Sequence, residues 1–132
     1  MKTTCDLVTA DLLEAFPKAI SIYAFGSRVT GTARPDSDLD LAILVVGYAD
    51  PLALWEAANQ LAVKLNYDVD LLDLRAANTV MQHQIIITGK KLYGDSLDAQ
   101  LYELFILKEK FYLDDLRAEQ LKDIAKEGKI YA

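Results

Sequence analysis

The sequence is poor in the residues on which disulfide-bonded and zinc-binding proteins depend. Its 132 residues include one cysteine, Cys5, and one histidine, His83. A single cysteine cannot form an internal disulfide, which fits a reducing compartment, and we expect a cytoplasmic protein. A single histidine without cysteine or histidine neighbours does not form a zinc site, so we expect His83 to be a packed or surface residue.

Long apolar runs and an excess of basic residues are also absent. No segment approaches the roughly 20 apolar residues that span a bilayer, and residues 1–10 lack the apolar core of a secretory signal. The 14 basic and 20 acidic side chains give a net charge of −6, which argues against broad, non-specific binding to nucleic acid. Net acidity suits a basic protein partner, or it merely aids solubility. We therefore expect neither membrane insertion nor direct binding to nucleic acid.

Two common phosphate-binding motifs are missing, while the composition is that of an ordinary globular domain. The dinucleotide fingerprint G-x-G-x-x-G and the G-K-[ST] of the P-loop do not occur. Hydrophobic residues make up 52% of the chain and charged residues 26%, which is enough apolar material for a core at this length. We predict one domain over residues 1–132, without repeats or linkers.

The apolar periodicity predicts helices that flank a small mixed β-sheet, in an α/β or α+β fold. Helices are expected over residues 4–16, 51–65, 76–88 and 96–126, a short helix within 26–32, and strands over 19–25, 38–46, 67–74 and 90–93. Thr3 or Thr4 is expected to cap the first helix, and Asp50 with Pro51 to start the second. Gly128 suits the end of the last helix, whose aromatic residues have spacings that suit core or partner packing. Those residues are Tyr102, Phe105, Phe111 and Tyr112.

Two aspartates, Asp38 and Asp40, stand one residue apart at the head of an apolar run. Side chains at positions i and i+2 of a strand share a face, so these two carboxylates are expected to project together, with the intervening apolar residues on the opposite face. Carboxylates this close repel each other unless a cation lies between them. Hard oxygen ligands favour Mg²⁺, which is usually held by one or two carboxylates and by substrate phosphates.

A Gly-Ser pair, Gly26 and Ser27, follows the preceding apolar run and stands before the short predicted helix. Glycine there lets the backbone approach a ligand closely, and a helix N-terminus favours anions. Ser27 can donate to a phosphate oxygen, cap the helix, or do both. Arg28 is expected either to contact the triphosphate or to form a surface ion pair, and Arg34 is a second candidate. Arg75 is expected to be a surface charge.

The Gly-Ser pair at 26–27, ten intervening residues and the Asp-x-Asp at 38–40 resemble the GSX10DXD signature of the DNA polymerase β-like nucleotidyltransferase superfamily. The longer string GSRVTGTARPDSDLDLAIL is similar to the minimal nucleotidyltransferase (MNT) family, and the resemblance extends over about 19–93. Members of this family are often MntA-like antitoxins, each paired with a HEPN-domain ribonuclease toxin. The resemblance implies a polymerase β-like fold, here followed by the long C-terminal helix that the apolar pattern predicts, with two Mg²⁺ ions and ATP as substrate.

The family resemblance also implies a third carboxylate, on a neighbouring strand that reads roughly V-D-L. The segment 69–71 matches this pattern, so we predict Asp70 and keep Asp68 and Asp73 as alternatives. Asp68 shares the strand face of Asp70 but lies near the strand entrance, and Asp73 lies on the opposite face if pairing is regular. The predicted catalytic and metal-binding residues are therefore Asp38, Asp40 and Asp70, and the predicted nucleotide-binding residues are Gly26, Ser27 and Arg28.

The implied reaction is attack of a hydroxyl on the α-phosphorus of ATP, with release of pyrophosphate. In an MntA-like antitoxin the acceptor is a tyrosine of the HEPN toxin, so a hetero-oligomer with the toxin is expected. Two alternatives are an antitoxin that neutralises its toxin by binding alone and a nucleotidyltransferase for a small-molecule hydroxyl. Clustered carboxylates destabilise a fold unless a metal is used, which argues against binding alone. The chain also has little room for a small-molecule acceptor domain. Nothing in it reads adenine or sets the number of AMP units transferred.

Overall fold

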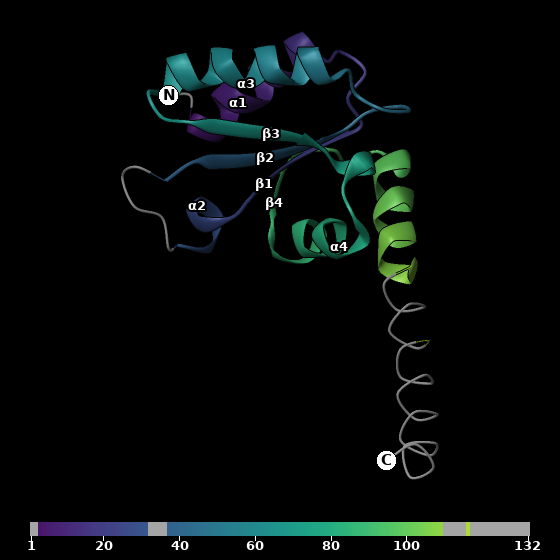
Figure 1. Ribbon diagram of the computed structural model, residues 1–132. Coiled ribbons are helices and arrows are strands. Elements are labelled where there is room, and N and C mark those ends of the chain that lie inside the picture. The colour runs from purple at the N-terminus through teal and green to yellow at the C-terminus, as the bar shows by residue number, and fades with distance from the viewer. Residues whose placement is uncertain (1–2, 32–36, 110–115, 117–132) are drawn as a thin grey trace, which may run out of the picture.

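The structure, a computed structural model, describes residues 3–31, 37–109 and 116 (Figure 1). The last predicted helix is described over residues 97–109 and at residue 116, and the rest of its expected length lies outside the described residues. Four residues singled out above also lie outside them, namely Arg34, Phe111, Tyr112 and Gly128. In the described part of the chain, no helix has the length and apolar character that a membrane crossing requires.

Four strands form one mixed sheet in the order β3-β2-β1-β4. They are β1 (Ser21–Phe25), β2 (Leu39–Leu44), β3 (Val69–Asp73) and β4 (Lys90–Tyr93). β1 lies antiparallel to both β2 and β4, whereas β2 and β3 are parallel. Parallel neighbours need a crossover connection, and a helix between β2 and β3 supplies it. The strand predicted over residues 90–93 is confirmed, and it lies at an edge of the sheet.

The helices are α1 (Thr4–Ala15), α2 (Ser27–Thr30), α3 (Pro51–Leu65), α4 (Thr79–Thr88) and a further helix over residues 97–109. The Thr3 hydroxyl accepts from the backbone N–H of Asp6, while the Asp6 carboxylate accepts from the N–H of Thr3, which makes a capping box for α1. The Asp50 carboxylate caps α3, and Pro51 stands in its first turn. Both predicted helix starts are confirmed.

The helix predicted over residues 76–88 begins later than expected. Residues Leu74–Ala76 form a separate 3₁₀ helix, because the Asp73 carboxylate accepts from the backbone N–H of Arg75 and turns the chain there. Asn78 then caps α4 through the N–H of Met81. Side-chain caps of this kind compete with a continuous helix. Apolar periodicity does not predict them, so the predicted helix began too early.

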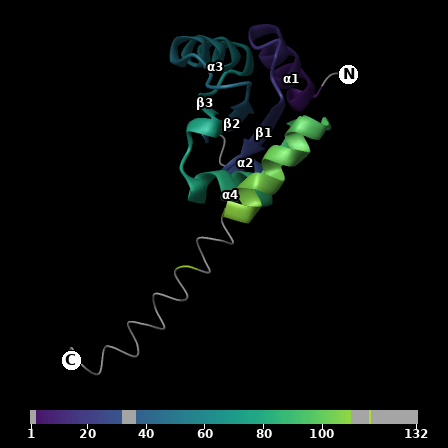
Figure 2. The ribbon, with the colours of Figure 1, turned by 90° about the vertical axis from the view of Figure 1, so that its right-hand side faces the viewer.

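The helices cover both faces of the sheet. Helices α1 and α3 lie on one face, and α4 with the helix over residues 97–109 lies on the other (Figures 1 and 2). Leu39, Leu41 and Ile43 pack towards α1 and α3, as the alternation predicted, whereas Ala42 and Leu44 pack on the opposite face. Asp40 shares the alternation of those last two residues and therefore belongs to the α4 face. In Figure 1, α2 lies beside the end of the sheet where β2 begins, and α4 lies beneath the other end.

Candidate active site

Gly26 connects β1 to α2 and lies directly against the carboxylate of Asp40. β1 pairs with β2 so that Phe25 stands opposite Asp40. At Gly26 the backbone has a φ of 80°, which side-chain-bearing residues rarely adopt. A Cβ added at Gly26 would overlap Oδ2 of Asp40 and lie 3.2 Å from its Cγ. The Gly-Ser pair and the Asp-x-Asp pair, separate in sequence, therefore meet at one end of the sheet.

Three carboxylates gather beside this turn. The parallel register of β2 and β3 puts Asp40 opposite Asp70, and Asp38 stands immediately before β2. Asp38 and Asp70 are exposed, whereas Asp40 is half-buried. Partial burial raises the pKa of Asp40 above its ordinary value, and the negative charges of Asp70 and Asp38 raise it further. The three carboxylates thus concentrate negative charge at this end of the sheet.

The other two candidates for the third carboxylate have different surroundings. Asp73 is buried, and its carboxylate accepts hydrogen bonds from the N–H of Ala49 at 2.9 Å and of Arg75 at 3.0 Å. Its two oxygens therefore stabilise the backbone at the opposite end of β3. Asp68 is exposed and precedes β3, where its carbonyl accepts from Leu39 N at 2.9 Å. Of the three candidates, Asp70 is the one in register with Asp40.

The donor set of the site fits a hard divalent cation. Its side-chain donors are three carboxylates without histidine or cysteine, a combination typical of Mg²⁺ sites. Burial is the first cause of the raised pKa of Asp40, and the second is the negative charge of Asp70 and Asp38, which a bound cation would offset. Among the described residues, no three His, Cys, Asp or Glu side chains stand close enough together to hold a metal ion already.

Arg28 contacts Ser37 and Tyr67, neither of which its sequence context indicated. Its Nε and Nη2 both donate to the carbonyl of Ser37, at 2.9 Å and 2.6 Å. Its Cζ lies 3.9 Å from the centroid of the Tyr67 ring, a stacked cation–π contact. The sequence did not identify Tyr67 or Ser37 as contacts of Arg28, because nothing near either residue in the chain indicates a partner for an arginine.

Arg75 was expected to be a surface charge, and that prediction is wrong. The side chain is half-buried, with Nη2 donating to the Val45 carbonyl at 3.2 Å and Cζ 4.8 Å from the centre of the Tyr102 ring. Its Nε is buried without a hydrogen-bond partner. Tyr102 packs into the α4 face of the core as predicted, whereas Phe105 on the same helix is exposed. His83 is half-buried on α4.

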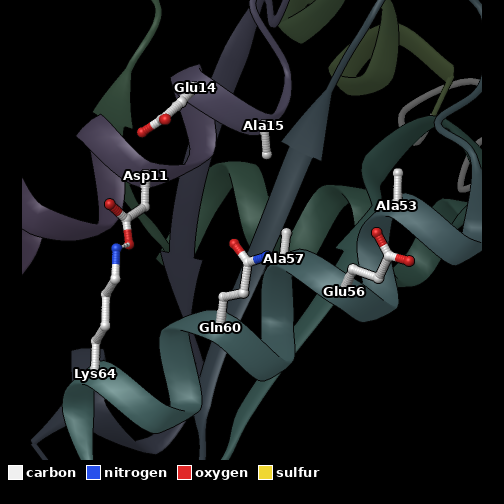
Figure 3. Close-up of a pocket in the computed structure, with 8 residues that line it drawn as sticks. All are labelled: Asp11, Glu14, Ala15, Ala53, Glu56, Ala57, Gln60 and Lys64. Carbon is white, nitrogen blue, oxygen red and sulfur yellow. Dashed lines mark hydrogen bonds and ion pairs between the residues drawn. The ribbon is translucent and has the colours of Figure 1, made fainter.

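Figure 3 shows a pocket between α1 and α3. These helices cover the face of the sheet opposite to that of Asp40. The pocket has a volume of about 340 Å³, and Asp11 from α1 and Lys64 from α3 form an ion pair of 2.7 Å at one side of it. Glu14 and Glu56 also line it. Because the sheet separates this pocket from the three carboxylates, it is not part of the candidate site.

Comparisons with known proteins identify the family of this chain. Residues 9–98 match the family described as polymerase beta, nucleotidyltransferase. The protein adenylyltransferase MntA of Shewanella oneidensis is 42% identical over 109 residues, which cover 83% of this chain and 76% of that protein. The resemblance inferred from the Gly-Ser and Asp-x-Asp motifs is confirmed.

Two solved structures are similar along almost the whole chain. A chain in a crystal structure of a toxin-antitoxin with AMP-PNP has a TM-score of 0.80 and 35% identity, and the match covers 93% of this chain and 99% of that one. A chain in a structure of tri-AMPylated Shewanella oneidensis HEPN toxin in complex with MNT antitoxin has a TM-score of 0.74 and 33% identity, covering 92% and 96%. The chain therefore belongs to the polymerase β nucleotidyltransferase family.

Proposed function

We propose that this chain is an antitoxin nucleotidyltransferase that acts in the cytoplasm. It transfers AMP from ATP to a tyrosine hydroxyl of a cognate HEPN ribonuclease toxin, releases pyrophosphate and so neutralises the toxin. The observation that carries the proposal is the meeting of Gly26 with Asp40, itself in register with Asp70. The similarity to an adenylyltransferase, and to the antitoxin in a complex with an AMPylated HEPN toxin, supports the same reaction.

The Gly-Ser turn is the proposed binding site for the triphosphate. Gly26 carries no side chain, so a phosphate oxygen can approach its backbone next to the carboxylates. Ser27, at the first position of α2, can donate its hydroxyl and its N–H to the same phosphates. The contact of Arg28 with the triphosphate stays a prediction, because two of its N–H groups already donate to Ser37.

The three carboxylates are the proposed ligands of the divalent cations. Asp38, Asp40 and Asp70 supply hard oxygen donors, and Asp40 has to lose its proton before it can coordinate a cation. Bound Mg²⁺ would lower the pKa of the acceptor hydroxyl and neutralise charge on the triphosphate and on pyrophosphate. Asp70, which is exposed near the start of β3, is the proposed acceptor of the proton from the hydroxyl.

The helix over residues 97–109 is the proposed contact surface for the toxin. Its apolar residues at i, i+4, i+7 and i+8 are exposed, so the part of the chain that the structure describes leaves one face of the helix uncovered. These residues are Leu97, Leu101, Leu104 and Phe105. An apolar helix face of this kind suits the surface of another protein, and we propose a hetero-oligomer in which the HEPN toxin covers it.

Intact-mass spectrometry of both proteins tests the proposed reaction. The chain is incubated with ATP, Mg²⁺ and the HEPN protein, in parallel with Asp38→Asn, Asp40→Asn and a matched control, Glu56→Gln. Glu56 is an exposed acid on the opposite side of the sheet, so its variant should transfer AMP normally. We expect the toxin to gain mass in whole AMP units with the wild type and the control only. An unmodified toxin in a stable complex would instead indicate neutralisation by binding.

A further inference from the structure

Arg28 joins the three segments on which the predicted site residues stand. It belongs to α2, next to the Gly-Ser pair, and its guanidinium contacts Ser37, which precedes Asp38. It also stacks on the ring of Tyr67, which precedes β3. We infer that Arg28 is a positioning residue, which holds Asp38 in place for the transfer by clamping Ser37 and Tyr67. The inference rests on the proposed function.

The contact with Ser37 orients the peptide group that leads into Asp38. Two N–H groups of one planar guanidinium converge on a single carbonyl oxygen, at 2.9 Å from Nε and 2.6 Å from Nη2. Both bonds are partly shielded from water, which strengthens charge-assisted hydrogen bonds. Because the Ser37 carbonyl and the Asp38 nitrogen belong to the same rigid peptide plane, fixing the oxygen restricts where Asp38 can stand.

The contact with Tyr67 ties the same guanidinium to the entrance of β3. The ring lies 3.9 Å from Cζ of Arg28, and Tyr67 stands two residues before the strand. The ladder between β2 and β3 opens at this level, where Leu39 N donates to the Asp68 carbonyl at 2.9 Å. Arg28 therefore bridges the point at which the strands carrying Asp40 and Asp70 begin to pair.

Only arginine can satisfy both partners at once. Its guanidinium is planar, so one edge donates to the carbonyl while one face stacks on the aromatic ring. Lysine keeps the positive charge but has a single ammonium group that cannot offer an edge and a face together. The charge-conserving change Arg28→Lys thus separates the clamp from a simple electrostatic attraction for phosphate.

Repulsion among the carboxylates explains why Asp38 needs to be held. Asp38 and Asp70 both disfavour the charged form of Asp40, so the three groups tend to move apart when no cation is bound. A misplacement of about 1 Å at a catalytic group can cost roughly 100-fold in rate. Loss of the clamp should therefore lower kcat and the affinity for a divalent cation, while the KM for ATP changes little.

The test uses Arg28→Lys, Tyr67→Leu and Tyr67→Phe in the full chain. A matched control is Arg75→Lys, because Arg75 also donates to a backbone carbonyl and stacks on a tyrosine, but at the other end of the sheet. Manganese binding is titrated by electron paramagnetic resonance without nucleotide, and binding of an unreactive ATP analogue by calorimetry. Transfer kinetics then give kcat and the KM for ATP, and melting curves verify that each variant folds.

The expected result is a shared defect of Arg28→Lys and Tyr67→Leu. Both should weaken manganese binding by about 10–100-fold, the usual effect of removing a residue that orients a metal ligand. Their kcat should fall in parallel while analogue binding is retained. Tyr67→Phe keeps the ring and should behave as wild type, as should Arg75→Lys. If Tyr67→Leu does not fold, Arg28→Lys decides the question alone.

Two results would overturn the inference. One is manganese binding and kcat that stay unchanged in Arg28→Lys and Tyr67→Leu. The other is weaker analogue binding in Arg28→Lys but not in Tyr67→Leu, which would make Arg28 a direct triphosphate contact. A wild-type chain without transfer activity would overturn the proposed function instead, and the manganese titrations would still decide whether Arg28 positions the carboxylates.

Discussion

Gly26 and Asp40 stand so close that any side chain at position 26 would take the place of the Asp40 carboxylate. A Cβ there would lie 3.2 Å from Cγ of Asp40 and overlap its Oδ2. The contact follows from the antiparallel pairing of β1 with β2, which puts the last residue of β1 opposite Asp40. Glycine at this turn therefore has two roles: it adopts a positive φ, and it leaves space for the carboxylate of Asp40.

Replacing Gly26 by alanine should abolish AMP transfer. Gly47 offers a matched control, since its φ of 74° is similar but nothing lies within 4 Å of an added Cβ. Both variants should lose about 1–2 kcal/mol of unfolding free energy from backbone strain. Only Gly26→Ala should also displace Asp40 and lose transfer activity. Urea unfolding and a transfer assay check this, and equal activity of the two variants would contradict it.

Changing Asp70 to alanine should affect activity, whereas changing Asp73 to alanine should affect stability. Asp70 is exposed, so Asp70→Ala should leave the unfolding free energy nearly unchanged while it removes transfer. Asp73 is buried and accepts from two backbone N–H groups, so Asp73→Ala should cost about 1–3 kcal/mol for each N–H left unsatisfied. Denaturant titration and the transfer assay measure both properties. A stable, inactive Asp73→Ala beside an active Asp70→Ala would reverse the assignment of the third carboxylate.

The stability of the cation-free protein should depend on pH through Asp40. Its pKa is raised in the folded state by burial and by Asp70 and Asp38, so the folded chain binds this proton more tightly than the unfolded chain. The resulting stabilisation is complete below the unfolded pKa of about 3.9 and disappears as pH rises through the folded pKa. Asp40→Asn should therefore be more stable than wild type at neutral pH in the presence of a chelator. The difference should shrink in acid, and melting curves at several pH values would show it.

Magnesium should stabilise the wild type but not Asp40→Asn. A cation that binds only the folded chain raises stability by mass action, by about 2.7 kcal/mol at a concentration 100-fold above its dissociation constant. The gain in melting temperature should grow as pH rises through the pKa of Asp40, because proton and cation compete for this carboxylate. Glu56→Gln should respond like wild type. An equal magnesium effect in Asp40→Asn would place the cation elsewhere.

Tyr23 attaches the helix over residues 97–109 to the sheet. Its buried hydroxyl donates to Oε1 of Glu103, and Lys91 of β4 pairs with the same oxygen at 2.7 Å. Tyr23→Phe should cost about 1.5–3 kcal/mol of unfolding free energy, the usual value for a hydrogen bond to a charged group. Tyr93→Phe, at a partly exposed position on β4, serves as the control and should change little. Urea titration of both variants provides the comparison.

The exposed face of that helix should matter for the complex rather than for the fold. Leu101→Glu and Leu104→Glu place charges in an apolar surface that the toxin is proposed to cover, and burying an unpaired charge is costly. Each change should weaken binding to the HEPN protein by at least tenfold, or about 1.4 kcal/mol, without lowering the melting temperature. Val63→Glu on α3, where the side chain is 83% exposed, is the control. Calorimetric titration against the toxin measures the effect.

Much of this architecture is encoded within short stretches of the chain. The alternation of apolar residues in β2 and the cap residues Thr3 and Asp50 predicted a strand face and two helix starts that the structure confirms. Each of these features depends on neighbours within a few positions. The spacing of the Gly-Ser and Asp-x-Asp motifs likewise predicted the family from the sequence alone.

Contacts between distant segments determined how the candidate site is assembled. The sequence by itself determined the element types and the candidate carboxylates, but it left three aspartates open as the third acid. Only the register of β2 against β3 put Asp70 beside Asp40, and a slip of one residue would have turned the other face of the strand to the site. The clamp of Arg28 on Ser37 and Tyr67 likewise exists only after the segments meet. Such contacts depend on how distant segments pack, and the local propensities of the residues do not predict this packing.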